Sequence, residues 1–262
     1  MSDGEIILGD CIQGMRALDA GSFNLIVADP PYNLKKDFGP WKETERKAEW
    51  RDWTRLWLEE AMRLLSEEGN IFVYGIHHHM CWVQCMMLEM GLIYRRQIIW
   101  NYENGFAGYG KRSLNATYEP LLWFSKSERY IYTPIREPYK SQERLKHKII
   151  KNGKVWQPNP EGRMAGDIWP FPTLAGRRFR DEKVDHPTQK PLSISRRLVK
   201  HFSNPNDTVL VPFVGSGSEC VAAVMEGRSY LGFELNEDYV SIARDRIARA
   251  QDSVESEITL LV

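Results

Sequence analysis

The chain has 262 residues, 42% of them hydrophobic, and its 35 basic and 35 acidic side chains cancel to a net charge of zero. This length and apolar content suffice for one large domain and exclude a disordered chain. The N-terminal MSDGEIILGD lacks the basic and apolar regions of a signal peptide, and no apolar run has transmembrane length, so no membrane partner is expected. Four cysteines without a disulfide-framework spacing indicate reduced thiols and a cytoplasmic protein.

The first half of the chain alternates strands and helices. A strand is expected at 5–10, a helical turn at 11–18 and a buried strand within 23–32. Residues 35–49 are charged and contain Gly and Pro, which predicts a mobile loop. Apolar residues at helical spacing predict a helix over 50–68, with Gly69 as its C′ residue.

Further elements follow up to residue 126. The patterns predict a strand at 70–75, a helix at 77–90 and strands at 92–102 and 118–126. His77, His78 and His79 are consecutive. Adjacent residues on a helix point in different directions, so this run does not have the spacing of a metal site and no metal is expected.

Residues 130–185 interrupt the alternation and contain no long periodic segment. They hold 12 Lys and Arg against 7 Asp and Glu, a net charge of +5, which leaves −5 on the rest of the chain. A solvated loop region would have a similar composition, but a basic insertion with aromatic residues also suits contact with nucleic-acid phosphates. Nucleic-acid contact is the interpretation that we favour.

The last third returns to regular alternation. Helices are expected at 191–202, 219–227 and 236–250, with strands at 207–213 and 229–234; a poorly ordered tail is expected from residue 251. Alternating strands and helices predict an α/β fold with a mostly parallel, twisted sheet flanked by helices. The basic segment is then an irregular insertion within one domain spanning residues 1–250.

A rigid turn follows the strand FNLIVA, where the chain reads ADPPYNL over residues 28–34. Pro30 and Pro31 lack backbone donors and have fixed φ angles, and each restricts the residue before it to extended backbone. The strand therefore ends in a stiff row of acceptors, namely the Asp29 carboxylate and the carbonyls of Asp29 and Pro30, beside the aromatic face of Tyr32. A simple strand-ending turn would use the same residue types.

A second pattern indicates a nucleoside site. Gly215 and Gly217 lie where a strand turns into a helix, and the next strand ends in Glu234, a position from which a carboxylate can bind ribose hydroxyls. The loop continues Ser218-Glu219, without the Lys of a phosphate-binding loop, and Cys220 stands where a dinucleotide fingerprint has Gly or Ala. A cofactor with a ribose and no phosphate fits better, and S-adenosyl-L-methionine is the common one.

With these motifs in this order, the chain resembles the β-type amino-group DNA methyltransferases of prokaryotes and phages. The resemblance rests on DPPYNL at 29–34, HPTQKP at 186–191, PFVGSGS at 212–218 and GFELNEDYVSIARDRI at 232–247, with YEPLLWFSKS at 118–127 as a further family segment. It spans roughly residues 5–250 and implies the Rossmann-like methyltransferase fold. It also places the target-recognition region at 130–185, within a single methyltransferase domain of residues 1–250 that is followed by a tail at 251–262.

The resemblance implies roles for individual residues. Asp29, Pro30, Pro31 and Tyr32 match the catalytic turn of the family. The residues that match its cofactor site are Asp10, Cys11, Asp29, Lys190, Phe213, Gly215, Ser216, Gly217, Ser218, Glu234 and Leu235. Among them, Lys190 lies in the run that approaches the carboxylate of the cofactor. One position departs from the pattern, because Val211 stands where the family usually has Asp, and this removes a charge near the cofactor.

The implied reaction is transfer of a methyl group from S-adenosyl-L-methionine to the N6 amino group of a flipped-out adenine in duplex DNA. Asp29 as the first motif residue favours adenine over the N4 amine of cytosine, which remains the alternative. None of the four cysteines follows a proline, as the nucleophile of carbon-5 cytosine enzymes does. A dinucleotide-dependent oxidoreductase and a non-catalytic DNA-binding remnant are the remaining alternatives. The family also implies a homodimer and a cognate restriction endonuclease as partners.

Overall fold

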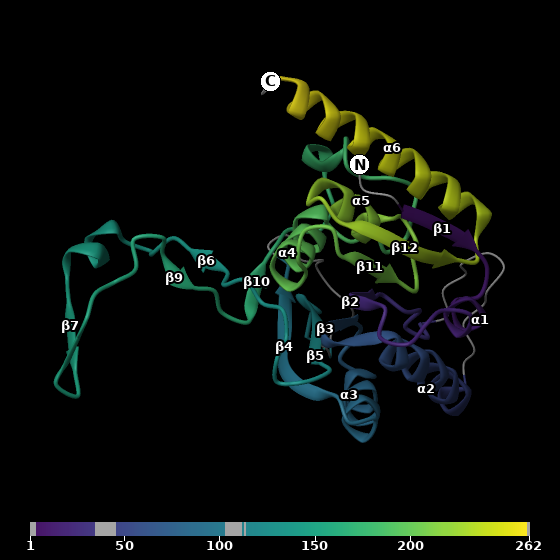
Figure 1. Cartoon of the computed structure of the whole chain (residues 1–262), viewed down its shortest axis with the longest axis horizontal. Coiled ribbons are helices and arrows are strands. Elements are labelled where there is room, and N and C mark those ends of the chain that lie inside the picture. The colour runs from purple at the N-terminus through teal and green to yellow at the C-terminus, as the bar shows by residue number, and fades with distance from the viewer. Residues whose placement is uncertain (1–3, 35–45, 103–111, 113, 261–262) are drawn as a thin grey trace.

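A computed structural model describes residues 4–34, 46–102, 112 and 114–260, so most of the loop expected at 35–49 lies outside the described residues. An eight-stranded sheet forms the centre of the molecule, with the order β1-β12-β11-β2-β3-β5-β4-β10 (Figure 1). Its strands are β1 (Gly4–Leu8), β2 (Phe23–Ala28), β3 (Leu65–Tyr74), β4 (Ile93–Asn101), β5 (Tyr118–Ser125), β10 (Ile168–Pro170), β11 (Thr208–Val211) and β12 (Ser229–Glu234). Within the described ranges, no helix is both long and apolar enough to cross a membrane.

Helices cover both faces of the sheet, as the alternation predicted (Figure 1). One apolar core lies beneath α4 (Leu192–Phe202), α5 (Ser218–Met225) and α6 (Glu237–Leu260), and a second lies beneath α1 (Cys11–Arg16), α2 (Lys47–Leu64) and α3 (Met80–Glu89). Burial of these two apolar faces is the main favourable contribution to folding. The predicted α/β class with a mostly parallel sheet is confirmed.

Strand direction determines which residues meet at one edge of the sheet. β1, β12, β11, β2 and β3 are mutually parallel, so their carboxyl ends share an edge. The strand order reverses between β11 and β2, which is where open α/β sheets bind ligands. β5 is antiparallel to both β3 and β4, so its first residues and the last residues of β4 reach the same edge. Glu119 and Tyr102 thereby join the residues that follow the parallel strands.

The junction of α2 and β3 differs from the prediction. The helix ends at Leu64 instead of residue 68, and Leu65 pairs with Phe23 at the start of the next strand. The register then shifts, and regular pairing resumes where Asn70 faces Leu25. Gly69 is therefore not a helix cap. A Cβ atom at this position would lie 2.7 Å from the Leu65 side chain, so glycine allows the chain to pass closely over that residue.

The C-terminal segment also differs from the prediction. Residues 251–262 were expected to form a poorly ordered tail, but α6 continues to Leu260. Ala243, Ile247 and Ala250 of this helix are buried on the sheet at a helical spacing. Residues 251–256 extend the same helix at half-buried or exposed positions.

Part of the basic segment forms an arm that leaves the body of the protein (Figure 1). Its base pairs β6 (Arg136–Glu137) with β9 (Arg163–Met164), and its outer part pairs β7 (Ile149–Lys151) with β8 (Lys154–Trp156). Two short 3-10 helices, η1 (Gln142–Lys146) and η2 (Arg177–Phe179), complete the segment. The segment is not wholly separate, however, because β10 joins the main sheet beside β4.

Candidate active site

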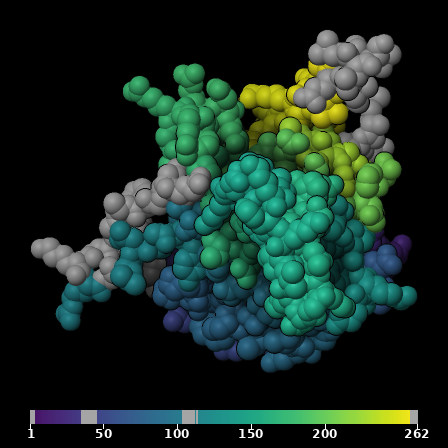
Figure 2. Space-filling model, turned by 90° about the vertical axis from the view of Figure 1, so that its left-hand side faces the viewer, coloured from purple at the N-terminus to yellow at the C-terminus, as the bar shows by residue number. Residues whose placement is uncertain are grey.

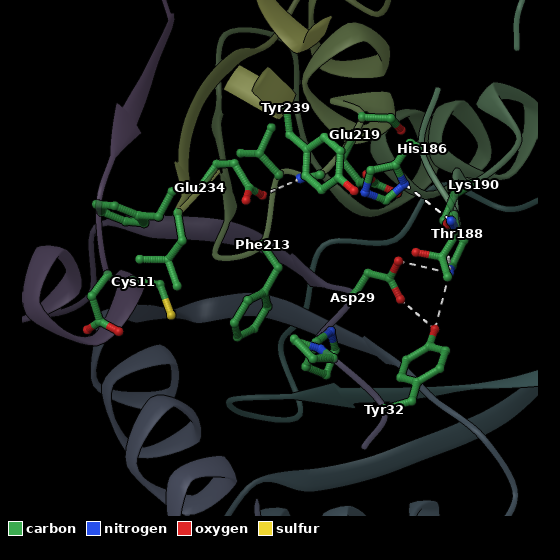
Figure 3. Close-up of a pocket in the computed structure, with 18 of the residues that line it drawn as sticks. Cys11, Asp29, Tyr32, His186, Thr188, Lys190, Phe213, Glu219, Glu234 and Tyr239 are labelled. Carbon is green, nitrogen blue, oxygen red and sulfur yellow. Dashed lines mark hydrogen bonds and ion pairs between the residues drawn. The ribbon is translucent and has the colours of Figure 1, made fainter. Parts of the chain in front are cut away.

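A cavity at the carboxyl edge of the sheet brings the two predicted motifs together (Figure 3). One end is formed by the turn after β2, with Asp29 and Tyr32, and the other by the segments after β1 and β12. The loop between β11 and α5 lies between them. The sequence-predicted residues that line the cavity are Asp10, Cys11, Asp29, Pro30, Pro31, Tyr32, Lys190, Phe213, Gly215, Ser216, Glu234 and Leu235. Segments as far apart as residues 10 and 235 therefore form one site.

The Asp29 carboxylate is held by two side chains. The Tyr32 hydroxyl donates to Oδ1 at 2.5 Å, and the Lys190 ammonium lies 2.8 Å from Oδ2 (Figure 3). Burial and the charge of Asp29 raise the pKa of Tyr32, so the phenol remains protonated as a donor. Tyr32 is buried, but it lines the cavity, and its hydroxyl faces Asp29.

Lys190 is buried at the centre of this cluster, with 3% of its side chain exposed. Its ammonium also lies 3.4 Å from Oε2 of Glu119, and it donates to the Tyr32 hydroxyl at 3.1 Å. Burial alone would lower the pKa of Lys190, but the carboxylates of Asp29 and Glu119 outweigh it, and the pKa is raised. Lys190 is therefore a permanent cation. The resemblance implied that Lys190 approaches the cofactor; in this structure it lines the cavity, and its ammonium contacts Asp29.

The catalytic turn is supported from behind by two aromatic residues. The buried Trp50 donates its indole N–H to the Pro31 carbonyl at 2.9 Å, and the ring of His79 packs against Trp50 with centroids 4.6 Å apart. Burial lowers the pKa of His79, so this ring stays neutral in the apolar core. Among the described residues, none donates to the Pro30 carbonyl. The turn is thus fixed through Pro31, and Pro30 keeps its acceptor free.

The glycine loop is shaped by a close approach and a left-handed turn. Gly215 has φ = +50°, and a Cβ atom there would lie 2.9 Å from the imidazole of His186. Gly217 has φ = +80°, and its Cβ atom would lie 2.7 Å from that of Ala243. Both positions exclude larger residues. Gly217 faces α6 instead of the cavity, which differs from its predicted cofactor role.

Ser218 also lies behind the cavity wall. Its hydroxyl donates to the Lys190 carbonyl at 2.8 Å and accepts from Arg246 at 3.1 Å. Together these bonds join the HPTQKP run to the glycine loop and to α6. Ser218 therefore holds Lys190 in place through its backbone, whereas the sequence had assigned it to the cofactor.

Glu234 has the geometry expected of a ribose-binding carboxylate. Its Oε2 accepts from the N–H of Gly215 at 2.8 Å, and its Oε1 accepts from the N–H of Asn236 at 2.9 Å. These bonds fix the carboxylate at the cavity wall, and each oxygen retains a lone pair for a hydroxyl donor. Burial raises the pKa of Glu234 despite the two backbone donors.

The remaining end of the cavity is largely apolar. Phe213 packs edge-on against Trp57, with ring centroids 5.3 Å apart, and lies 5.7 Å from Trp53. Cys11 is buried, and burial raises the pKa of its thiol, so it contributes as a small apolar group and not as a nucleophile. Asp10 caps α1 by accepting from the N–H of Gln13 at 2.9 Å. This part of the cavity is thus lined by an aromatic ring and a buried thiol, with the Glu234 carboxylate beside them.

The structure adds residues that the sequence analysis missed. His186 and Thr188 line the cavity from the HPTQKP run, and Trp53 and Tyr239 line it from α2 and α6. Glu219 contributes a carboxylate that is 4% exposed and accepts from Ser195 at 3.0 Å. Val211 is fully buried in the core, and Glu219 is an acidic residue of this loop region that lines the cavity. The family segments at 186–191 and 232–247 contain His186, Thr188 and Tyr239, whereas Trp53 and Glu219 lie outside the segments that carry the resemblance.

Comparison with known proteins agrees with this site. Residues 23–245 match the family model of the N6 and N4 DNA methylases, and the chain belongs to this family. It is 32% identical to the Type II methyltransferase M1.MboII of Moraxella bovis over 89% of this chain and 92% of that protein. It is 30% identical to the DNA adenine methyltransferase YhdJ of Escherichia coli (strain K12), covering 92% and 82% of the two chains. The chain is thus a DNA methyltransferase.

The fold is shared with more distant enzymes. The solved structure of the PvuII DNA methyltransferase, which is cytosine-N4-specific, superimposes with a TM-score of 0.71 over 94% of this chain and 86% of that one. The two sequences are 16% identical, so this likeness concerns the fold alone. It confirms the predicted methyltransferase architecture.

Replacing Trp50 by Phe tests the support behind the catalytic turn. The change leaves the half-buried Pro31 carbonyl without its donor, at a cost of about 1 kcal/mol of stability. A looser turn misplaces Asp29, so we expect turnover to fall by about tenfold or more. The thermal midpoint and the methylation rate are measured together. Trp123→Phe, which removes a 2.8 Å bond from a half-buried indole to Asn70, is the matched control. Equal turnover in the two variants would contradict a specific role for Trp50.

Proposed function

We propose that this enzyme transfers the methyl group of S-adenosyl-L-methionine to the N6 amino group of an adenine flipped out of duplex DNA. The observation that carries the proposal is the single cavity in which a ribose-binding carboxylate, Glu234, and an acceptor turn, Asp29 to Tyr32, lie at opposite ends. A nucleoside bound at Glu234 and a base bound at Asp29 would meet within it.

The acceptor turn makes the amine nucleophilic. The lone pair of an exocyclic adenine amine is delocalised into the ring, and acceptors directed at its two N–H bonds localise it on nitrogen. The Asp29 carboxylate and the Pro30 carbonyl are the two acceptors, and both are fixed before the base arrives. When bound, S-adenosyl-L-methionine supplies an electrophilic methyl group on a sulfonium. The new N–C bond forms as the S–C bond breaks, and a proton then leaves the alkylated nitrogen.

Adenine is favoured over cytosine by two observations. Asp29 opens the acceptor turn, where the family uses Asp for adenine and Ser for the N4 amine of cytosine. A relative 30% identical over most of the chain is an adenine methyltransferase by name. The N4 amine of cytosine has the same chemistry, so it remains the second candidate and is distinguished by the identity of the methylated nucleoside.

The cavity opposes the remaining alternatives. Glu219 lies buried on the wall beside the glycine loop, where its charge would repel the pyrophosphate of a dinucleotide. A non-catalytic remnant does not need the rigid acceptor pair at Asp29 and Pro30.

Two protein partners are proposed. A restriction endonuclease is one, because the relative M1.MboII is named a Type II methyltransferase. A homodimer is proposed from the family alone, because Trp50 and Trp57 of α2 are buried in the core and leave no aromatic face for self-association.

The basic arm is the proposed target-recognition region of this single domain. It stands out from the body on the side that faces the viewer in Figure 2. Ile150 is 75% exposed, and Val155 and Trp156 are each 61% exposed, on the β7–β8 hairpin at its far end. Lys148, Lys151 and Lys154 surround these apolar side chains. A basic two-stranded ribbon with an exposed aromatic residue suits contact with the phosphates and grooves of a duplex.

Replacing Asp29 by Ala tests the proposed reaction. We expect the variant to lose methyl transfer to duplex DNA and to keep measurable binding of S-adenosyl-L-methionine, because Glu234 and the glycine loop are unchanged. Transfer is followed with methyl-labelled cofactor and binding by calorimetry. An active Asp29→Ala enzyme would refute the acceptor mechanism, and absence of both transfer and binding in the unaltered enzyme would favour a DNA-binding remnant.

The raised pKa of Glu234 predicts a pH dependence of cofactor binding. The charged carboxylate is the acceptor for two hydroxyl donors, so lowering the pH toward its raised pKa protonates it and weakens binding. We expect Glu234→Gln to bind S-adenosyl-L-methionine about 10-fold or more weakly and with a flatter pH profile. Calorimetry between pH 8 and pH 5 measures both, with the exposed Glu237→Gln as the control. An unaltered profile in Glu234→Gln would exclude this role.

Removing the charges at the end of the arm tests its contact with DNA. Alanine at Lys148, Lys151 and Lys154 should weaken duplex binding and reduce the slope of log affinity against log salt by about 2–3, because fewer counterions are released. Cofactor binding should not change. Alanine at Arg16, Arg51 and Arg55, which lie on α1 and α2, is the control of equal charge. If both triple variants keep the slope of the unaltered protein, the arm does not contact phosphates.

A further inference from the structure

Two carboxylates compete for the one ammonium at the catalytic end of the cavity. The Nζ atom of Lys190 lies 2.8 Å from Asp29 and 3.4 Å from Glu119. Glu119 does not line the cavity, and no step of the proposed transfer uses it. Its position is nevertheless well defined. The Glu119 Oε1 atom accepts from the Tyr102 hydroxyl at 2.7 Å, and its Oε2 atom lies 3.5 Å from the Tyr32 hydroxyl.

The contact between Lys190 and Asp29 opposes the proposed reaction. Both oxygens of Asp29 are engaged in the free protein, one by Tyr32 and one by Lys190. An ammonium at 2.8 Å neutralises much of the negative charge that would otherwise draw the N–H bonds of the amine. A carboxylate in this state is a weak acceptor for a neutral amine. The ammonium must therefore withdraw from Asp29 as the target base enters.

The ammonium cannot withdraw into solvent, because Lys190 is 3% exposed. A buried cation that loses its partner is strongly destabilised. Glu119 is the second carboxylate within 4 Å of this ammonium in the described part of the chain. A small shift of Nζ toward Glu119 would exchange one ion pair for the other without exposing the charge. Tyr102, at the end of β4, holds Glu119 in the position to receive it.

We propose that Glu119 is a positioning residue for methyl transfer, which takes over the Lys190 ammonium when the target amine binds Asp29. The inference rests on the proposed function and adds to it a residue on β5 that acts through Lys190. Free enzyme keeps Lys190 on Asp29, and the enzyme with a flipped base keeps it on Glu119. The buried charge is neutralised in both states, and Asp29 becomes a strong acceptor only when the base is present.

This arrangement makes the effect of Glu119 depend on Lys190. In Glu119→Gln the ammonium has no second carboxylate within 4 Å among the described residues, so it stays on Asp29 and slows the chemical step. In Lys190→Met the ammonium is absent, Asp29 is an acceptor without displacement, and Glu119 has nothing left to do. A merely structural role of Glu119 would instead lower activity by the same factor in either background.

The test measures single-turnover methyl transfer to mixed-sequence duplex DNA, with the labelled methyl group counted over hours. Three variants are compared with the unaltered enzyme: Glu119→Gln, Lys190→Met and the double variant. We expect Glu119→Gln to lower the rate constant about tenfold or more and to leave the dissociation constant of S-adenosyl-L-methionine within about twofold. In the Lys190→Met background, the same substitution should change the rate less than about twofold. Glu128→Gln, which breaks a 2.7 Å ion pair with Arg95 at an exposed site, is the control and should have no effect.

Three results would overturn the inference. One is a Glu119→Gln rate equal to that of the unaltered enzyme, and another is the same loss in both backgrounds. The third is complete inactivity of Lys190→Met, since Asp29 without its ammonium is then not a competent acceptor. Failure of the proposed function is recognised separately: in that case the unaltered enzyme transfers no methyl group to DNA. The three results above are interpreted only when the unaltered enzyme is active.

Discussion

The buried ammonium of Lys190 is the constraint on which the arrangement of the active site depends. A cation that is 3% exposed is stable only if carboxylates surround it, and the chain brings Asp29 and Glu119 to it from β2 and β5. Lys190 itself is held by its backbone carbonyl, which accepts from Ser218 at the start of α5. The catalytic turn, the HPTQKP run and the glycine loop are therefore linked through one residue, whose side chain contacts Asp29 and whose carbonyl contacts Ser218.

The topology of the sheet explains how these segments meet. Parallel strands deliver their following residues to one edge, which accounts for Asp10, Asp29, Gly215 and Glu234. The antiparallel strand β5 reverses this rule, since it delivers its first residues there, and Glu119 is the second of them. The reversal places a carboxylate from a hairpin beside an acceptor turn from a parallel strand. Among these residues, Glu119 alone reaches the edge from an antiparallel strand.

Much of the fold and site could be predicted because the relevant signals are local. Prolines that end a strand at Asp29 and glycines that turn a strand into a helix act over a few residues. The pairing of Lys190 with Asp29 could not be predicted, since it joins residues 161 positions apart and depends on burial. Glu119 was missed because its role depends on the direction of β5. Likewise, Leu65 leaves the predicted helix only because Phe23 pairs with it, and Gly217 and Ser218 match a motif but face the protein interior.

The identity of the methylated nucleoside tests the account most directly. The enzyme is incubated with methyl-labelled S-adenosyl-L-methionine and mixed-sequence duplex DNA, the product is digested to nucleosides, and the labelled nucleoside is identified. Acceptors at Asp29 and Pro30 acting on a flipped adenine predict label on N6-methyladenine. Label on N4-methylcytosine would contradict the assignment of the base, and DNA without label would contradict the proposed reaction as a whole.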